Sequence, residues 1–267
     1  MIVHRKTLAE AIVFEGLGLH SGVPVVATVH PGGGGIWFRC ESERVEAIPA
    51  NVSDTRRCTR LGGIATIEHL MSALAGSEIT DVEVELTAPE LPAMDGSALP
   101  FWTDLSAAAK AELGEVEKPD LFTRVFAQEG GASIGIALGT GRGRYEFQSD
   151  RDWPYEQSFE TEDMLRDYGS QIAPARTTAF HHEIEMARQA GLGRGLDESS
   201  VLVLGPTGCV NAARFENELP RHKLLDLMGD LYLAGVPMRT LSIVGQRSGH
   251  RLNVEAASRL AAAMARP

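Results

Sequence analysis

The sequence has few cysteines and no long apolar run. Cys40, Cys58 and Cys209 are scattered over 267 residues. An odd, scattered set cannot complete a disulfide framework and argues against a cysteine-based zinc site, so it suits a reducing cytoplasm. No apolar run of about 18 residues occurs, which excludes a membrane-spanning helix, and no apolar segment typical of a signal peptide follows the first residues. We therefore expect a cytoplasmic protein without stable membrane insertion.

Basic residues are also in deficit. There are 25 Lys and Arg against 36 Asp and Glu, which gives a net charge of −11. This balance argues against nucleic acid or an acidic membrane as the main partner. It does not exclude an anionic small substrate, because a few local cations can bind a phosphate. The length fits one large soluble domain or two of about 130 residues.

Two glycine-rich segments lack the features of nucleotide-binding loops. Residues 16–22 contain two glycines two positions apart, but neither a third glycine nor a following helix. Residues 139–143 are not followed by the Gly-Lys-Ser/Thr ending of a phosphate loop. The first segment is better explained as a hairpin turn with His20 at its tip, where it could line a cleft.

What the sequence does contain is an apolar helix with a polar stripe. Residues 220–233 are mostly apolar and predict a buried helix. His222, Asp226 and Asp230 are spaced four apart, so they stack on one face. Burying them is costly unless they are paired or hold a metal, and His222 and Asp226 have the spacing of two zinc ligands. Taken alone, the stripe favours a simpler explanation, a His–Asp ion pair and a capping aspartate.

A second helix is expected from an N-cap at Thr66 to a glycine at Gly76. Glu68 and His69 are adjacent, so they point about 100° apart. They could still converge on one ligand, one as a metal ligand and the other as a base acting on a bound water. This pair alone is a weak signal, since most such pairs are surface or packing residues.

The rest of the chain predicts further elements. Strand-like alternation covers most of the first sixty residues and recurs near 82–86 and from 121 to 149. A helix is expected from Pro100 to about Leu113, followed by a polar linker at 114–120. Further helices are expected at Glu183–Ala190 and at the end of the chain, up to Ala265.

The two halves of the chain follow a similar order. Each has several strands and then a helix with a histidine near its start, and these helices end alike in residues 69–76 and 226–235. This hints at duplication and predicts two α+β domains, residues 1–115 and 120–267, whose helices could face each other.

If those helices face each other, His69, His222 and Asp226 form one set. Three nitrogen or oxygen ligands leave a fourth position for water, which is the composition of a catalytic zinc site. Zinc lowers the pKa of such a water to about 7, and Glu68 is then the natural general base.

Other side chains could complete this site. His250, in a glycine-flexible loop, could be the general acid, and Asp230 could orient its neighbours. Thr177 could donate a hydrogen bond to a developing oxyanion. Lys223 and Arg247 are cations that suit a phosphate-bearing substrate.

A competing segment is rich in possible ligands. His181 and His182 are followed by Glu183 and Glu185. Adjacent histidines on a helix point apart, and no third ligand follows at the spacing of one turn. We interpret this segment as the solvated start of a helix.

Six segments, in this order, resemble those of the UDP-3-O-acyl-N-acetylglucosamine deacetylases, which are zinc amidases of lipid A biosynthesis. The segments are Gly16–Gly22, Ala65–Leu70, Pro92–Ala98, Ala175–Thr177, Arg221–Asp226 and Ser248–His250. Each is weak alone, but six in order are highly specific, and the resemblance runs from about residue 7 to about residue 262. It implies an α+β fold of two similar domains, each a sheet with a pair of helices, with the helices sandwiched between the sheets.

The resemblance also implies roles for single residues. The implied zinc ligands are His69, His222 and Asp226; the implied catalytic residues are Glu68, His250, Thr177 and Asp230; the implied substrate-binding residues are Lys223, Arg247 and Gly249. An insert near 181–210 would form the passage for the acyl chain. Four features depart from the family pattern and bear on nucleotide and acyl preference: Leu61–Ile64 is shorter than the usual insert of the first domain, Arg247 replaces a lysine, Thr178 replaces an aromatic residue, and Trp153-Pro154 replaces a His-Pro pair.

The expected function is therefore zinc-dependent hydrolysis of the N-acetyl group of an acylated UDP-sugar by a monomer with one zinc per chain. Iron(II) could occupy the same nitrogen and oxygen ligands. Two alternatives stay open, a non-catalytic zinc or nucleotide-sugar binding protein and an amidase acting on another N-acetyl sugar.

Overall fold

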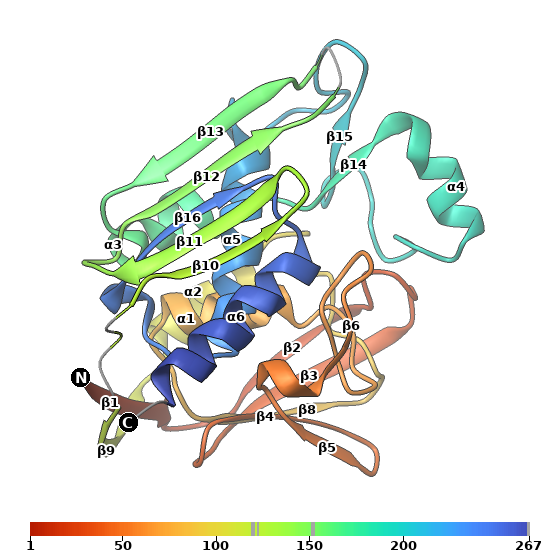
Figure 1. Cartoon of the computed structure of the whole chain (residues 1–267). Coiled ribbons are helices and arrows are strands. Elements are labelled where there is room, and N and C mark those ends of the chain that lie inside the picture. The colour runs from red at the N-terminus through yellow and green to blue at the C-terminus, as the bar shows by residue number, and fades with distance from the viewer. Residues whose placement is uncertain (119–120, 122, 151–152, 266–267) are drawn as a thin grey trace.

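The computed structural model describes residues 1–118, 121, 123–150 and 153–265. Two five-stranded sheets form its outer layers, and helices fill the space between them (Figure 1). The helices of this inner layer are α1 (Glu68–Gly76), α2 (Leu99–Ala107), α5 (Glu218–Tyr232) and α6 (His250–Met264). The expected α+β fold, with helices sandwiched between two sheets, is confirmed.

The first sheet has the strand order β2-β3-β8-β4-β5. Its strands are β2 (Ile12–Leu17), β3 (Pro24–Pro31), β4 (Ile36–Cys40), β5 (Glu43–Glu46) and β8 (Val82–Leu86). The pairing is antiparallel except between β4 and β8, which run parallel. In β4 and β8 buried and partly exposed residues alternate, so each strand buries one face against the helices.

The second sheet repeats this topology with the order β10-β11-β16-β12-β13. Its strands are β10 (Val125–Glu129), β11 (Ala132–Leu138), β12 (Gly143–Gln148), β13 (Glu156–Thr161) and β16 (Leu241–Gln246). Again one pair is parallel, here β12 with β16. In both halves one helix precedes the central strand and another follows it, so the duplicated pattern seen in the sequence extends to the topology. One continuous apolar core joins the two halves.

Smaller elements complete the described chain. These are β1 (Ile2–Leu8), β6 (Val52–Asp54), β7 (Arg60–Leu61), β9 (Lys110–Glu117), α3 (Met164–Asp167), β14 (Thr178–Phe180), α4 (Ile184–Gln189) and β15 (Leu202–Leu204), with short 3-10 or π turns at Pro49–Asn51, Tyr168–Ile172, His181–Glu183 and Met238–Thr240. Strands β14 and β15 pair in parallel, and α4 projects beside them away from the two sheets (Figure 1). None of the helices described here has the length and apolar character needed to cross a membrane.

One predicted helix is too long. The helix expected from Pro100 to about Leu113 ends at Ala107, and Lys110–Glu117 instead forms β9, antiparallel to β1. Polar and apolar residues alternate through this stretch, which is the strand period, but its Glu and Lys content resembles a helix end or a linker. The predicted linker at 114–120 therefore overlaps a strand up to Glu117, and residues 119–120 lie outside the described residues.

The start of α1 also differs from the prediction. Thr66 is not the N-cap, because the helix begins at Glu68 and Ile67 occupies the capping position. Thr66 has a φ of 62°, and its hydroxyl donates to Glu90 at 3.2 Å instead of to the helix. The predicted helices at 183–190, 220–233 and the chain end are confirmed as α4, α5 and α6.

Candidate metal centre and active site

Three predicted ligands from the two halves meet between α1 and α5. One ligand atom each from His69, His222 and Asp226 lies within 4.8 Å of the others, and all three residues are buried. The Oδ1 atom of Asp226 is 3.4 Å from Nε2 of His222 and 3.7 Å from Nε2 of His69. The imidazole rings stand nearly perpendicular, with centroids 5.1 Å apart. This is a compact set of two nitrogen donors and one oxygen donor.

A glycine makes this convergence possible. His69 lies in the first turn of α1 and His222 in the first two turns of α5. Where the helices cross, a Cβ atom on Gly229 would collide with the main-chain carbonyl of Glu68. Because any larger side chain would push the helices apart, the glycine sets the approach of the two histidines.

The electrostatics of the cluster favour metal ligation. Burial, helped by the neighbouring His222, lowers the pKa of His69 to about 3. Burial also lowers the pKa of His222, although Asp226 opposes this. Burial alone would raise the pKa of Asp226, but the neighbouring His222 and Lys223 hold it well below its usual range. The set therefore consists of two neutral imidazoles and one carboxylate, the protonation states that bind metals.

The two oxygens of Asp226 have different surroundings. Its Oδ2 accepts a hydrogen bond from Nζ of Lys223 at 2.8 Å. Its Oδ1 is buried and has no hydrogen-bond partner among the described residues. A buried carboxylate oxygen without a donor is costly, and a cation between Oδ1 and the two imidazoles would satisfy it. The residues present thus fit a bound metal ion.

The second imidazole is oriented by the main chain. Nδ1 of His222 lies 3.0 Å from the carbonyl oxygen of Ala175. Because a carbonyl only accepts, Nδ1 carries the proton and Nε2 keeps its lone pair. This lone pair faces Asp226, as metal ligation requires.

A second group of polar side chains adjoins the triad. Oε1 of Glu68 lies 3.8 Å from Nε2 of His250, and Nδ1 of His250 lies 3.0 Å from Oδ2 of Asp230. Two further residues, which the sequence analysis did not single out, hold these carboxylates. Thr59 donates its main-chain N–H to Glu68 at 3.0 Å and its hydroxyl to Asp230 at 2.5 Å, and Asn253 donates to Asp230 at 2.9 Å. Neither Thr59 nor Asn253 lies in a sequence motif that predicts a catalytic or metal-binding role.

The pKa values of Glu68 and His250 are both raised in this group, but for different reasons. Burial raises the pKa of Glu68 to about 7, with His250 partly opposing the rise. Burial alone would lower the pKa of His250, but the carboxylates of Asp230 and Glu68 outweigh it and raise it to about 9. Near neutral pH the site therefore pairs a carboxylate that readily exchanges a proton with a protonated imidazole.

The remaining predicted residues surround this cluster less closely. Thr177 donates its main-chain N–H to Gly96 at 2.7 Å, two residues beyond the carbonyl that contacts His222. Gly249 caps the start of α6, directly before His250. Arg247 is 3.5 Å from the exposed carboxylate of Asp150. Among the contacts of the described residues, none joins Thr177, Gly249 or Arg247 to the triad.

The other histidines weighed in the sequence lie apart. His181 and His182 are exposed in the turn before α4, as expected of a solvated helix start. His20 contacts the 181–210 segment, where its Nδ1 accepts from the N–H of Gly193 at 3.3 Å. Within the described chain, the His69–His222–Asp226 set is the one cluster with metal-binding geometry.

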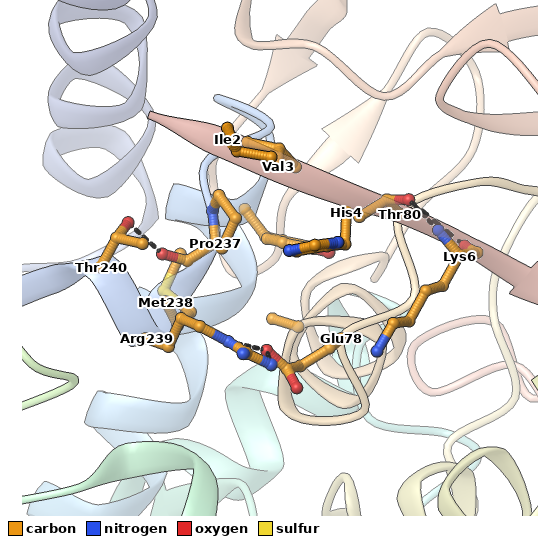
Figure 2. A pocket seen from close by; sticks show the side chains of 12 residues that line it. Ile2, Val3, His4, Lys6, Glu78, Thr80, Pro237, Met238, Arg239 and Thr240 are labelled. Atoms are coloured by element: carbon orange, nitrogen blue, oxygen red, sulfur yellow. Dashed lines mark hydrogen bonds and ion pairs between the residues drawn. The ribbon is translucent and has the colours of Figure 1, made fainter. Parts of the chain in front are cut away.

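A separate small cavity lies at the C-terminal ends of α1 and α5, where Ala75 and Tyr232 line it. Glu78, Met238 and Arg239 line it, together with the start of β1, and Arg239 forms an ion pair with Glu78 (Figure 2). Its volume is about 60 Å³. Because ligand sites for small molecules usually exceed about 300 Å³, this cavity is too small for a sugar nucleotide.

Comparison with known proteins identifies the family. The family model described as UDP-3-O-acyl N-acetylglycosamine deacetylase matches residues 5–262. A protein of Nostoc named UDP-3-O-acyl-N-acetylglucosamine deacetylase is 35% identical over 97% of this chain and 98% of its own length. Proteins with the same name from Neisseria gonorrhoeae and Leptospira biflexa are 35% and 32% identical, over 93% and 96% of this chain and 87% and 89% of their own. The resemblance inferred from six short segments is confirmed, and the chain belongs to the UDP-3-O-acyl-N-acetylglucosamine deacetylase family.

Proposed function

We propose that this protein is a zinc-dependent deacetylase of lipid A biosynthesis. It hydrolyses the N-acetyl group of UDP-3-O-acyl-N-acetylglucosamine and releases acetate. The names of the relatives support the reaction. The observation that carries the metal dependence is the buried Oδ1 of Asp226, which lacks a hydrogen-bond donor among the described residues and faces two imidazoles.

The donor set suits zinc. Two imidazole nitrogens and one carboxylate oxygen, from His69, His222 and Asp226, leave a fourth position open. Bound there, zinc would acidify a water molecule and polarise the acetamide carbonyl. Iron(II) accepts the same donors, so the metal present in the cell depends on supply as well as on the ligands.

The side chains around the ligands would divide the proton transfers. Glu68 accepts the proton of the attacking water, and a pKa near 7 lets it take up and release a proton at neutral pH. His250, kept protonated by Asp230, stabilises negative charge on the carbonyl oxygen, and either His250 or the protonated Glu68 delivers a proton to the leaving amine. Thr177 donates a hydrogen bond to the same carbonyl oxygen.

The substrate would extend away from this centre in two directions. Lys223, Arg247 and Gly249 contact the sugar and the phosphates. The 181–210 insert holds the acyl chain, which is supported by a cavity of about 470 Å³ between α4 and β15, lined in part by Ile184 and Leu192. We also propose a division into domains at 1–115 and 120–267, a cytoplasmic location and a monomeric state.

The experiment that tests this function is acetate release by the Glu68→Gln variant. The amide keeps an oxygen for the N–H of Thr59 but cannot accept a proton, so kcat should fall by about 10²- to 10⁴-fold. Zinc content should stay near one per chain, because Glu68 is not a ligand. The exposed Glu162→Gln variant serves as the control and should keep full activity.

Two results would defeat the proposal. Retained turnover in Glu68→Gln would remove the role of Glu68. A wild-type protein that binds zinc and the nucleotide sugar without releasing acetate would be a binding protein, and hydrolysis of a different N-acetyl sugar alone would reassign the substrate.

A further inference from the structure

The polar stripe of α5 has a fourth member that lies outside the proposed catalytic and ligand set. Glu218 is the first residue of α5, one turn before His222, and only 1% of its surface is exposed. A carboxylate at a helix N-terminus is favoured by the helix dipole, but full burial requires further compensation. The stripe therefore runs from Glu218 through the two ligands to Asp230.

Glu218 receives four hydrogen bonds. Its Oε1 accepts from the main-chain N–H of Arg176 at 3.0 Å and from Nε of the same residue at 2.9 Å. Its Oε2 accepts from Nη2 of Arg176 at 3.2 Å and from the main-chain N–H of Arg214 at 2.6 Å. Burial alone would raise the pKa of Glu218, but these donors lower it, so the group is a carboxylate. The fork of Arg176 and the carboxylate thus form a buried, bidentate pair.

Arg176 also forms hydrogen bonds with the segments on either side of β15. Its Nη1 donates to the carbonyl of Ser199 at 3.0 Å, and its Nη2 donates to the carbonyl of Ala212 at 2.7 Å. Arg176 is itself 4% exposed. One side chain therefore ties the segment before β15 and the segment after it to the first turn of α5.

The main chain of Arg176 connects this pair to a metal ligand. The peptide unit between Ala175 and Arg176 donates its N–H to Glu218, and its carbonyl accepts from Nδ1 of His222. A peptide unit is planar, so its two polar ends cannot turn independently. The unit therefore bridges Glu218 and His222, which lie one helical turn apart on α5, and a rotation at one end would displace the other.

We propose that Glu218 and Arg176 are positioning residues for the metal ligand His222. Glu218 fixes the orientation of the 175–176 peptide, the peptide fixes the imidazole with its proton on Nδ1, and the Nε2 lone pair is thereby aimed at the metal. Arg176 holds the carboxylate in place and couples it to the loop. The inference rests on the proposed function only in requiring a metal at His69, His222 and Asp226.

A matched control lies at the other end of the molecule. Asp81 is a buried carboxylate that accepts from Arg5 through Nε at 3.1 Å and from the N–H of Gly35 at 2.7 Å. It thus resembles Glu218 in burial and partners, but among the described residues it forms no hydrogen bond or ion pair with a proposed metal ligand. Asp81→Asn removes the same charge without touching the metal centre.

The experiment measures Co²⁺ binding by the metal-free protein, using competition with a chelator and the visible spectrum of the cobalt complex. Urea unfolding is measured alongside. We expect Glu218→Gln and Asp81→Asn to lose comparable stability, while Glu218→Gln alone weakens Co²⁺ binding, by about 10- to 100-fold.

¹⁵N NMR of the metal-free Glu218→Gln variant should show His222 as a mixture of tautomers, where the wild type has the proton on Nδ1. Arg176→Lys keeps the positive charge and the main-chain N–H, so its loss of affinity should be smaller.

Wild-type Co²⁺ affinity and an unchanged His222 tautomer in Glu218→Gln would overturn the inference. If Glu218→Gln does not fold, the Co²⁺ affinity of Arg176→Lys is compared with that of Asp81→Asn instead. If neither folds while Asp81→Asn does, the pair serves folding and the inference is likewise overturned. A wild-type protein that binds Co²⁺ but releases no acetate would defeat the proposed function and leave this inference standing, because its readout is metal affinity.

Discussion

At the scale of single residues, each buried polar side chain of the α5 stripe has a hydrogen-bond or ion-pair partner. These partners offset the free-energy cost of burying the side chains. The stripe on α5 has four ionisable residues, each at most 2% exposed. The pairs are Glu218 with Arg176, His222 with the carbonyl of Ala175, Asp226 with Lys223, and Asp230 with His250. Removing one partner of such a pair leaves the other buried and unpaired, which costs more than the pair contributes. Conservative substitutions are therefore the informative ones here.

His250 makes stability depend on pH. Its pKa is raised from 6.5 to about 9 in the folded protein, so its contribution is fully present below pH 6.5 and is lost as pH rises through 9. We expect the free energy of unfolding of the metal-free protein to fall by on the order of 3 kcal/mol between pH 6.5 and 9, at about 1.4 kcal/mol per pKa unit. Urea unfolding at both pH values measures this.

The control for this prediction is His250→Gln, in which most of the fall should disappear. Asp230→Asn should reduce it, because Asp230 is the main carboxylate that holds the charged imidazole. An equal fall in the wild type and in His250→Gln would assign the pH dependence to other groups.

At the scale of elements, the crossing of α1 and α5 determines whether the ligands meet. Gly229 stands where the main chain of α1 leaves no room for a Cβ atom. The colliding atom is the carbonyl of Glu68, so a displacement would move both the proposed base and the adjacent ligand His69. Packing at this crossing and geometry at the proposed metal centre are therefore coupled.

We expect Gly229→Ala to lower stability by about 1 to 3 kcal/mol through overpacking and to weaken zinc binding as well. Gly135→Ala in β11 is the matched control, because an added Cβ there meets nothing within 4 Å. It should change the free energy of unfolding by less than about 0.5 kcal/mol. Chemical denaturation and a zinc titration test both variants. If Gly229→Ala loses stability but binds zinc with unchanged affinity, the packing at this crossing does not control the metal ligands, and the predicted coupling is wrong.

At the scale of the whole molecule, the proposed metal joins the two repeats. His69 comes from α1 in the first half, and His222 and Asp226 come from α5 in the second. Each half has its own sheet, while the helices form a shared layer. A metal held by both halves would bind the folded chain far better than the unfolded one, so it should act as a stabilising ligand.

We expect zinc to raise the thermal unfolding temperature, and chelation to lower it again. At a free zinc concentration of about 100 times Kd, the gain in free energy is about 2.7 kcal/mol. His69→Ala should abolish this gain. His4→Ala, at an exposed histidine on β1, should leave it intact. A thermal scan with and without zinc tests the prediction, and a gain that survives in His69→Ala would place the metal elsewhere.

Part of this fold could be read from local patterns. The alternation of strands, the apolar helix around His222 and the repeated helix endings led to the α+β class, and six short segments led to the family. The patterns failed where local preference was ambiguous. Lys110–Glu117 pairs as β9 with β1, more than a hundred residues away in the chain, and Thr66 bonds to Glu90 instead of capping α1.

The sequence by itself determined which residues could do chemistry, because the spacing of His222, Asp226 and Asp230 fixes their common helix face. Only the tertiary structure decided that His69 meets them, that Thr59 and Asn253 hold the neighbouring carboxylates, and that one peptide links Glu218 to His222. The physical reason is distance along the chain. Helical periodicity acts over a few residues, whereas these contacts depend on how two sheets and their helices pack, which no local spacing encodes.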